Sequence, residues 1–371
     1  MKTTTLPFSN SLIIPGDTER MKTSELMEAG PIFSMRYPGM VHYMPIGNMI
    51  IERLRNLVKH AHASMGSLEV KIPNYMKRGL LDSGEKVEKT FADKFVILPD
   101  PMGDYMILTT HEMELLDWLK GDGISYKSLP IRISFTKGIF RPIKNPKRIL
   151  KLREVEVQAM LSLDADQSGF ENSLQEYANA CESIFEKLQI GYVKQVSKTR
   201  NKTSPHSGFD LEYFYKSEEG ENVSSPSDGI KEKVLSLSMG YKYAPLPEFI
   251  RVTNQKNQLA DPVVGTYAMG LERLLFASFD SSRDQFGFDI PEAIRPFDSS
   301  VLVFGDEKEL YQKAKKIYES LSQEGKTVLF DDRPRAKRVE KARLSDYLGI
   351  PTKIIVSKSG IRSLKRKEIV N

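Results

Sequence analysis

Apolar and polar residues alternate clearly after residue 130, where polar side chains separate Ile131, Ile133 and Phe135. A period of two predicts a strand with one buried face. A turn at Asn145-Pro146 follows, and a second apolar run over 150–157 predicts a partner strand. The stretch 125–160 is therefore expected to form a strand–loop–strand unit.

Apolar residues at helical spacing predict the longer helices of the chain. The clearest helix begins at Asn48, a favourable cap residue, and ends at Gly66. Other helices are predicted at 110–119, at 169–188 and after 270, and strands at 94–98, 105–110, 209–215, 234–243 and from 263. The Ser-, Glu- and Gly-rich stretch 218–229 is predicted to be a loop.

The C-terminal part of the chain alternates strands with helices. Strands are predicted at 301–304, 327–330 and 353–356, and helices between them at 308–325 and 338–349. This βαβαβ order predicts a small parallel sheet with flanking helices. The segment 286–297, which contains two prolines, is interpreted as the linker before it. The polar residues 1–20 are expected to form a loose arm.

A chain of 371 residues is too long for one ordinary hydrophobic core and suits two domains. The predicted division is an N-terminal arm over 1–22, a larger domain over 23–297 and a small α/β domain over 298–371. No apolar run approaches the ~20 residues of a membrane span, and no secretory signal is recognised. The single cysteine, Cys181, excludes an internal disulfide and a cysteine-built metal site, so a cytoplasmic location is predicted.

The net charge of +5 is concentrated in the C-terminal segment. From Asp298 onward there are 17 Lys and Arg residues against 11 Asp and Glu, a balance of +6, and the preceding residues carry 37 against 38, a balance of −1. Such an excess is typical of proteins that bind a polyanion. A basic domain that is merely well solvated would have the same composition, so both interpretations stay open.

Three groups of residues are candidates for chemistry. The strand–loop–strand unit carries cations that a phosphate would satisfy and that a solvated hairpin would also tolerate: Arg141, Lys144, Lys147, Arg148, Lys151 and Arg153. Thr110 and Glu112 stand where a strand ends and a helix begins, either as binding groups or as a capping box. Arg273 lies one turn inside a helix at the edge of an apolar face, which favours an anionic ligand or a salt bridge.

Short motifs occur in order along the chain, from about residue 24 to residue 356. They are Pro45-Ile-Gly47, Thr110-His-Glu112, 125–130 (SYKSLP), Phe140-Arg141, Arg153-Glu154, Gly265-Thr-Tyr267, Gly270-Leu-Glu-Arg273, Arg283-Asp284, 291–296 (PEAIRP), Asp331-Asp-Arg333 and 348–351 (LGIP). Each is weak alone, but together they resemble the class II aminoacyl-tRNA synthetases, and prolyl-tRNA synthetase in particular.

The resemblance implies an α+β fold, in which an antiparallel-sheet catalytic domain is followed by a small α/β anticodon-binding-like domain. It also implies activation of proline or a similar amino acid with ATP and Mg²⁺, without a metal held by a protein cage, and transfer of the amino acid to tRNA. Members of the family usually form homodimers through the helix that follows Gly47. No membrane partner is implied.

The family's motifs also suggest roles for individual residues. Arg141 and Arg273 would be catalytic. ATP would contact Arg141, Lys151, Arg153, Glu154 and Arg273, and the amino acid would contact Thr110, Glu112, Arg141, His206, Thr266 and Tyr267. The tRNA would contact Arg333, Arg335, Lys337, Arg338, Lys341 and Arg343.

The chain departs from the family pattern within these motifs. The acidic residue expected two places after Arg141 is Ile143, the phenylalanine that would stack on adenine is Val155, and the expected glutamine is Ser238. Two further interpretations therefore stay open. One is a non-catalytic paralogue that acts as an RNA- or protein-binding subunit, and the other is a ligase that loads an acceptor other than tRNA.

Overall fold

The computed structural model describes residues 1–3, 12–77, 79–82, 96–100, 103–107, 110–120, 123–196, 210–224, 231–243 and 250–368. His206, one of the residues predicted to bind the amino acid, lies outside these ranges. Among the described residues, no helix is both long enough and apolar enough to cross a membrane.

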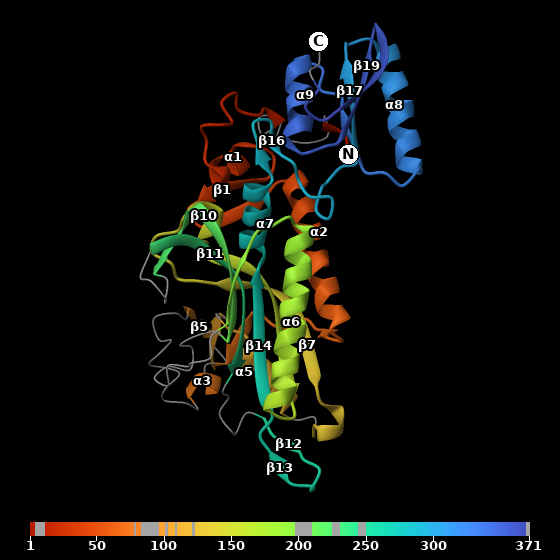
Figure 1. Cartoon of the computed structure of the whole chain (residues 1–371). Helices are drawn as coiled ribbons and strands as arrows, with labels where there is room; N and C mark the ends of the chain where they lie inside the picture. The colour runs from red at the N-terminus through yellow and green to blue at the C-terminus, as the bar shows by residue number, and fades with distance from the viewer. Residues whose placement is uncertain are drawn as a thin grey trace.

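A seven-stranded sheet forms the centre of the larger part of the chain (Figure 1). In spatial order its strands are β3 (Leu68–Glu69), β7 (Ile131–Phe140), β8 (Glu154–Asp164), β14 (Val263–Gly270), β11 (Lys231–Tyr243), β10 (Leu211–Ser224) and β9 (Val193–Val196). All neighbours are antiparallel except β3 and β7. The predicted strand–loop–strand unit is confirmed, because β7 and β8 pair along their length.

The loop predicted at 218–229 is wrong in its described part. β10 continues to Ser224, which pairs with Lys231 of β11, and the register shifts between Lys216 and Glu221. An irregularity of this kind interrupts the regular alternation of a strand. The polar sequence therefore resembles a loop, although its described residues, 218–224, belong to a strand.

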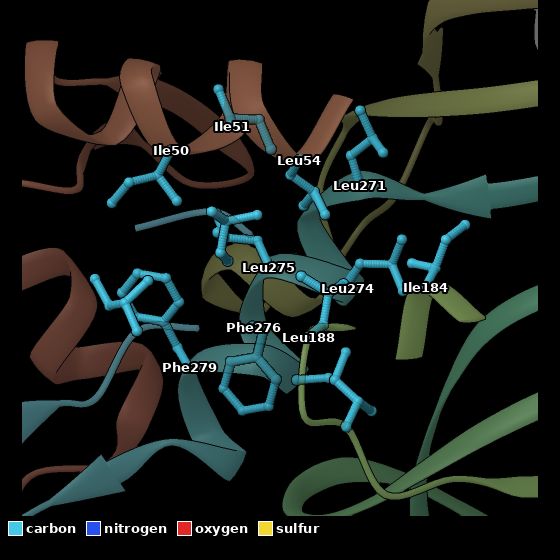
Figure 2. Close-up of a cluster of buried hydrophobic side chains, with 14 of the residues drawn as sticks. Ile50, Ile51, Leu54, Ile184, Leu188, Leu271, Leu274, Leu275, Phe276 and Phe279 are labelled. Atoms are coloured by element: carbon cyan, nitrogen blue, oxygen red, sulfur yellow. The ribbon is translucent and has the colours of Figure 1, made fainter. Parts of the chain in front are cut away.

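Three helices cover one face of this sheet and enclose the main hydrophobic core. They are α2 (Pro45–Ser64), α6 (Gln167–Lys187) and α7 (Leu271–Ser281). Figure 2 shows Leu54 of α2, Ile184 of α6 and Leu274 of α7 meeting in this core. The helix predicted to begin at Asn48 begins at Pro45 instead, because proline fits the first turn of a helix, where no N–H is needed.

The opposite face of the sheet carries helix α5 (Glu112–Leu119) and a small sheet of β4 (Tyr75–Lys77), β6 (Gly103–Ile107) and β5 (Val96–Asp100). A second hydrophobic cluster joins Leu115 and Leu116 of α5 to Phe135 of β7 and Val157 of β8. Shorter elements are α1 (Thr23–Ala29), β1 (Phe33–Tyr37), β2 (Met40–Tyr43), α3 (Gly79–Asp82), β12 (Val252–Thr253), β13 (Leu259–Ala260), β15 (Arg283–Asp284), β16 (Gly287–Phe288) and two 3₁₀ turns, Tyr126–Ser128 and Arg148–Leu150.

The C-terminal segment forms the predicted small sheet. Its order is β18 (Val328–Asp331), β17 (Ser299–Phe304), β19 (Thr352–Ser357) and β20 (Gly360–Lys365), with helices α8 (Lys308–Gln323) and α9 (Arg338–Tyr347). The first three strands are parallel, as predicted, and β20 adds an antiparallel strand that the sequence analysis missed. β20 is exposed along nearly all its length, so it lacks the apolar run of a buried strand.

The expected loose arm is wrong in its described residues. Figure 1 shows the N-terminus beside the C-terminal sheet, where the backbone N–H of Phe330 in β18 donates to the carbonyl of Met1 at 2.8 Å. The Thr3 hydroxyl donates to Asp331 at 3.1 Å. An edge strand such as β18 offers unpaired backbone groups, and the arm satisfies part of them.

The C-terminal sheet also packs on the larger part of the chain through α9. Leu344 and Tyr347 belong to the same hydrophobic cluster as α2 and α7, and the Tyr347 hydroxyl donates to the carbonyl of Leu26 at 2.9 Å. Arg366 adds an ion pair with Asp284 at 2.7 Å. These contacts fix the C-terminal sheet against the element that carries Arg273.

Candidate functional site

The centre of the candidate site is Glu112, the first residue of α5. Its side chain is buried, with 5% of its surface exposed. The hydroxyls of Thr266 and Tyr241 donate to its Oε1 at 3.1 and 3.2 Å, and the backbone N–H of His111 donates to its Oε2 at 3.1 Å. The Thr110 hydroxyl is also hydrogen-bonded to this carboxylate. The predicted Thr110–Glu112 pair is thus brought together.

The pairing of β11 with β14 places two of these hydroxyls on one face of the sheet. Tyr241 is paired directly with Thr266, and side chains of paired residues in a sheet point to the same side. Tyr267, the next residue of β14, points to the opposite side. Its hydroxyl lies 3.2 Å from the Ser162 hydroxyl and its ring packs on Tyr177 in the core. Tyr267 therefore does not join the site to which the sequence analysis assigned it.

Glu112 is an anion at neutral pH. Burial acts to raise the pKa of this carboxyl, but the neighbouring His111 and the hydrogen bonds from backbone N–H groups and the Thr110 hydroxyl outweigh it and lower the pKa to about 2. Burial lowers the pKa of the His111 imidazole, and the Glu112 carboxylate acts in the opposite direction. The site therefore holds a buried negative charge that a cationic group would neutralise.

The two predicted arginines lie in the same site as Glu112. Arg141 follows β7 and is exposed. Although the residue as a whole is exposed, partial loss of hydration at its guanidinium lowers the pKa of that group; the Glu112 carboxylate acts in the opposite direction, and the positive charge of Arg273 lowers it further. Groups that alter each other's pKa in this way are close in space. The structure thus brings together one anion and two cations from three separate parts of the sequence.

Arg273 is half-buried in the first turn of α7. Its Nη1 donates to the carbonyl of Ser236 at 3.1 Å. Within the described ranges no carboxylate forms an ion pair with it, so the salt bridge considered as an alternative is not present there. The charge of Arg273 also acts on the Glu212 carboxyl. Burial raises the pKa of Glu212, and Arg273 lowers it by a smaller amount. Arg273 is therefore a cation with capacity for an anionic ligand.

The other residues predicted to bind ATP have different surroundings. Lys151 lies 3.8 Å from the Glu221 carboxylate in an ion pair. The Nε of Arg153 donates to the carbonyl of Ile143 at 3.3 Å, so this side chain holds the loop that follows Arg141. Glu154 is exposed and lines a separate hollow of about 420 Å³, which Tyr43 of β2 also lines. Arg141 and Arg273 are thus the cations that stand with Glu112.

Sequence reasoning missed Tyr241, Glu212 and Ser236. Tyr241 donates to Glu112, and the Ser236 hydroxyl donates to Glu212 at 2.5 Å beside Arg273. The only available signal was the alternation of the strand 234–243, which places Tyr241 and Tyr243 on one face. That pattern does not reveal which strand pairs with β11, so the contact with Glu112 required the structure.

Two of the six residues predicted to contact tRNA are buried, which is contrary to that prediction. Arg333 is 8% exposed, pairs with Asp331 at 2.7 Å and donates to the carbonyl of Leu12 at 3.1 Å. Lys341 is 4% exposed and its Nζ donates to the carbonyl of Val303 at 2.6 Å. Both side chains are used inside the protein, because a buried charge needs such partners.

The four remaining basic residues are exposed at the N-terminus of α9 and along it; they are Arg335, Lys337, Arg338 and Arg343. The guanidinium of Arg338 lies over the Phe304 ring, 5.6 Å from its centre. Arg343 donates to the carbonyl of Gly16 at 3.0 Å. These four side chains are accessible to a polyanion, whereas Arg333 and Lys341 are not.

Comparison with known proteins supports the resemblance. No protein-family model matches the chain. A stretch of 125 residues, 34% of the chain, is 42% identical to the proline–tRNA ligase of Anaeromyxobacter sp. (strain K), but it spans only 21% of that protein. The proline–tRNA ligase of Anaplasma marginale (strain St. Maries) is 23% identical over 87% of the chain and 85% of its own length.

A solved structure of Giardia lamblia prolyl-tRNA synthetase, in complex with prolyl-adenylate, superimposes with a TM-score of 0.72. The match covers 93% of this chain and 73% of that one at 19% identity. The expected α+β fold, with an antiparallel sheet in its larger part and an α/β segment after it, is thus confirmed. Other curated relatives match over short stretches only. In these proteins the match with this chain spans 17% to 31% of their length.

Proposed function

We propose that this chain, which is prolyl-tRNA synthetase-like in sequence and fold, activates proline or a similar amino acid with ATP and transfers it to tRNA. The observation that carries the proposal is the arrangement of Glu112, Arg141 and Arg273. A buried anion stands beside two cations, and no ion pair joins Glu112 to Arg141 among the described residues. A free amino acid carries both an ammonium and a carboxylate, and this arrangement offers a partner for each.

The proposed reaction joins two anions. An oxygen of the amino acid's carboxylate attacks the α-phosphorus of ATP, the bond to the bridging oxygen breaks, and pyrophosphate leaves. Glu112 would hold the ammonium, while Arg141 would offset the charge that gathers between the carboxylate and the α-phosphate. Arg273 would bind the γ-phosphate, a role supported by its guanidinium, which donates to the Ser236 carbonyl and has no carboxylate partner among the residues that the structure describes.

Mg²⁺ would bind mainly through ATP. Within the described part of the chain, no group of three or more His, Cys, Asp or Glu side chains could hold a metal ion. Mg²⁺ commonly takes its ligands from phosphate oxygens and water, with one or two carboxylates. Adenine would lie against Val155, which is half-buried on the α5 face of the sheet. Without a stacking ring, its binding would be weaker by ~1 kcal/mol.

The tRNA would contact the exposed cations of α9. A role in translation would place the protein in the cytoplasm. A homodimer is proposed through α2 and the strand that follows it. Leu68 of β3 lies on the edge strand of the central sheet and is 69% exposed, which is unusual for a large apolar side chain. Sedimentation at micromolar concentration tests this, and a monomer would reject it.

A second candidate is a non-catalytic paralogue that binds RNA or protein. It is favoured by Arg153, whose Nε is occupied by the loop carbonyl of Ile143, and by the absence of a ring at Val155. A ligase with a non-tRNA acceptor is a variant of the first proposal, supported by the burial of Arg333 and Lys341. Amino-acid-dependent exchange of pyrophosphate into ATP separates the enzyme from the paralogue, and aminoacylation of tRNA separates the two ligases.

A further inference from the structure

We propose that Tyr241 is a positioning residue whose hydroxyl, together with that of Thr266, holds the Glu112 carboxylate away from Arg141 and ready for the amine of the substrate. The inference deepens the proposed function and rests on it. It assigns a role to a residue that none of the motifs in the sequence includes.

The first step is the direction of the hydrogen bonds. Glu112 is ionised, so it can only accept, and the hydroxyls of Tyr241 and Thr266 must both donate to it. Both bonds end on Oε1, at 3.2 and 3.1 Å, which is long for bonds between oxygens. The backbone N–H of His111 donates to Oε2 at 3.1 Å. The carboxylate is therefore oriented by fixed donors. These long bonds leave it able to accept a further hydrogen bond from the amine of the substrate.

The second step is the rigidity of the two donors. Tyr241 and Thr266 are opposite each other in the ladder of β11 and β14, which runs from Ser238↔Met269 to Tyr243↔Val264. Thr266 is 1% exposed, and Tyr241 is half-buried. Their backbones cannot move independently without breaking the sheet. The strands therefore fix the place where Glu112 stands.

The third step concerns Arg141. The Tyr241 hydroxyl donates to Glu112 at 3.2 Å, and the charge of Glu112 acts on the pKa of both Tyr241 and Arg141. Oppositely charged neighbours tend to pair, yet Glu112 and Arg141 form no ion pair. The hydrogen bonds to Oε1 stabilise the carboxylate in place of an ion pair with Arg141. A direct pair would have to be broken by each incoming amino acid, and the hydroxyls avoid that cost.

The test compares Tyr241→Phe, Thr266→Val and the matched control Tyr243→Phe in the full chain. Tyr243 lies two residues further along the same face of β11, where burial and the nearby Glu112 charge raise its pKa, yet within the described residues its hydroxyl forms no hydrogen bond with Glu112. Amino-acid-dependent pyrophosphate exchange gives KM for the amino acid and for ATP separately. Tyr241→Phe and Thr266→Val should each raise the amino-acid KM about tenfold, as expected for a hydrogen bond to a charged group. The KM for ATP should change less than threefold, and Tyr243→Phe should match the wild type.

The readout distinguishes positioning from general damage, because a loosened fold would raise both KM values. An unchanged or lower amino-acid KM in Tyr241→Phe would overturn the inference and leave the proposed function intact. If the wild type supports no exchange, calorimetric titration with proline decides. Binding that weakens about tenfold in Tyr241→Phe supports the inference although the proposed reaction fails, and equal or absent binding in both proteins overturns it.

Discussion

Tyr241 and Thr266 face each other across β11 and β14, and their hydroxyls donate to the same oxygen of Glu112. Three elements far apart in the sequence therefore meet at one carboxylate. The helix α5 supplies the anion, and two paired strands supply the donors that hold it. The carboxylate is only 5% exposed, and His111, backbone N–H groups and the Thr110 hydroxyl lower its pKa to about 2 although burial acts to raise it.

Replacing Glu112 with Gln should abolish amino-acid activation. The amide keeps the size of the side chain but removes the negative charge of Glu112, and the ammonium of the substrate loses its partner. ATP binding should persist, because Arg141 and Arg273 remain. Exchange assays combined with a direct ATP titration check this. Exchange at wild-type rates in Glu112→Gln would show that the amine is bound elsewhere.

Replacing Arg273 with Ala should reduce exchange by a factor of about 10² to 10³, the range found when one donor to a developing charge is removed. The effect should include a higher KM for ATP, since this side chain is assigned to the γ-phosphate. Arg251 provides the control, because it is exposed and pairs with Asp261 on a short distant hairpin. Equal activity of the two alanine variants would show that Arg273 has no role in the reaction.

Residue patterns predict much of the fold, and some motif residues are required by close packing. Gly47, for example, packs so closely on Ile32 that a Cβ would lie 1.7 Å from the Ile32 carbonyl oxygen. Local periodicity likewise predicted the strands of the β7–β8 unit and the βαβαβ order. Such patterns are properties of short segments, so they survive without knowledge of tertiary contacts.

The errors came from contacts between distant segments. Arg333 was assigned to tRNA because it is basic and lies in a motif, but Asp331 and the Leu12 carbonyl hold it inside the protein. Tyr267 was assigned to the site with Thr266, and the alternation of β14 turned it into the core. Tyr241 was missed, because strand pairing is not written in a single strand's sequence.

Arg333 and Arg335 form a natural pair for separating stability from tRNA binding. Arg333→Ala should lower the free energy of unfolding by about 3 kcal/mol or more, because it leaves the buried Asp331 carboxylate without its charged partner. Arg335→Ala should leave stability unchanged within about 0.5 kcal/mol, since the side chain is exposed. Denaturant titration measures both.

The tRNA affinity of Arg335→Ala should fall, and the slope of log affinity against log salt should become less steep by about one unit or less. Filter binding over a range of salt concentrations measures this. A wild-type affinity that does not depend on salt, or no binding at all, would reject the proposed tRNA surface on α9.

Glu272 predicts a pH dependence of stability. Burial raises the pKa of its carboxyl from an ordinary value near 4.5 to about 8. Between these two values the folded protein keeps a proton that the unfolded chain releases, so the free energy of unfolding falls as pH rises from 4.5 to 8. The full effect is at most about 5 kcal/mol. Glu272→Gln, which cannot ionise, should lose this slope, and thermal unfolding at pH 5, 7 and 9 compares the two proteins. Identical slopes would show that Glu272 is not desolvated in solution.

Glu112, Arg141 and Arg273 are proposed to form a site for adenylation of an amino acid. Pyrophosphate exchange with each of the twenty amino acids tests it most directly. The account predicts incorporation of labelled pyrophosphate into ATP with proline or a close analogue, and loss of that signal in Arg273→Ala. Absence of exchange with every amino acid, in a folded protein that binds ATP, would contradict it.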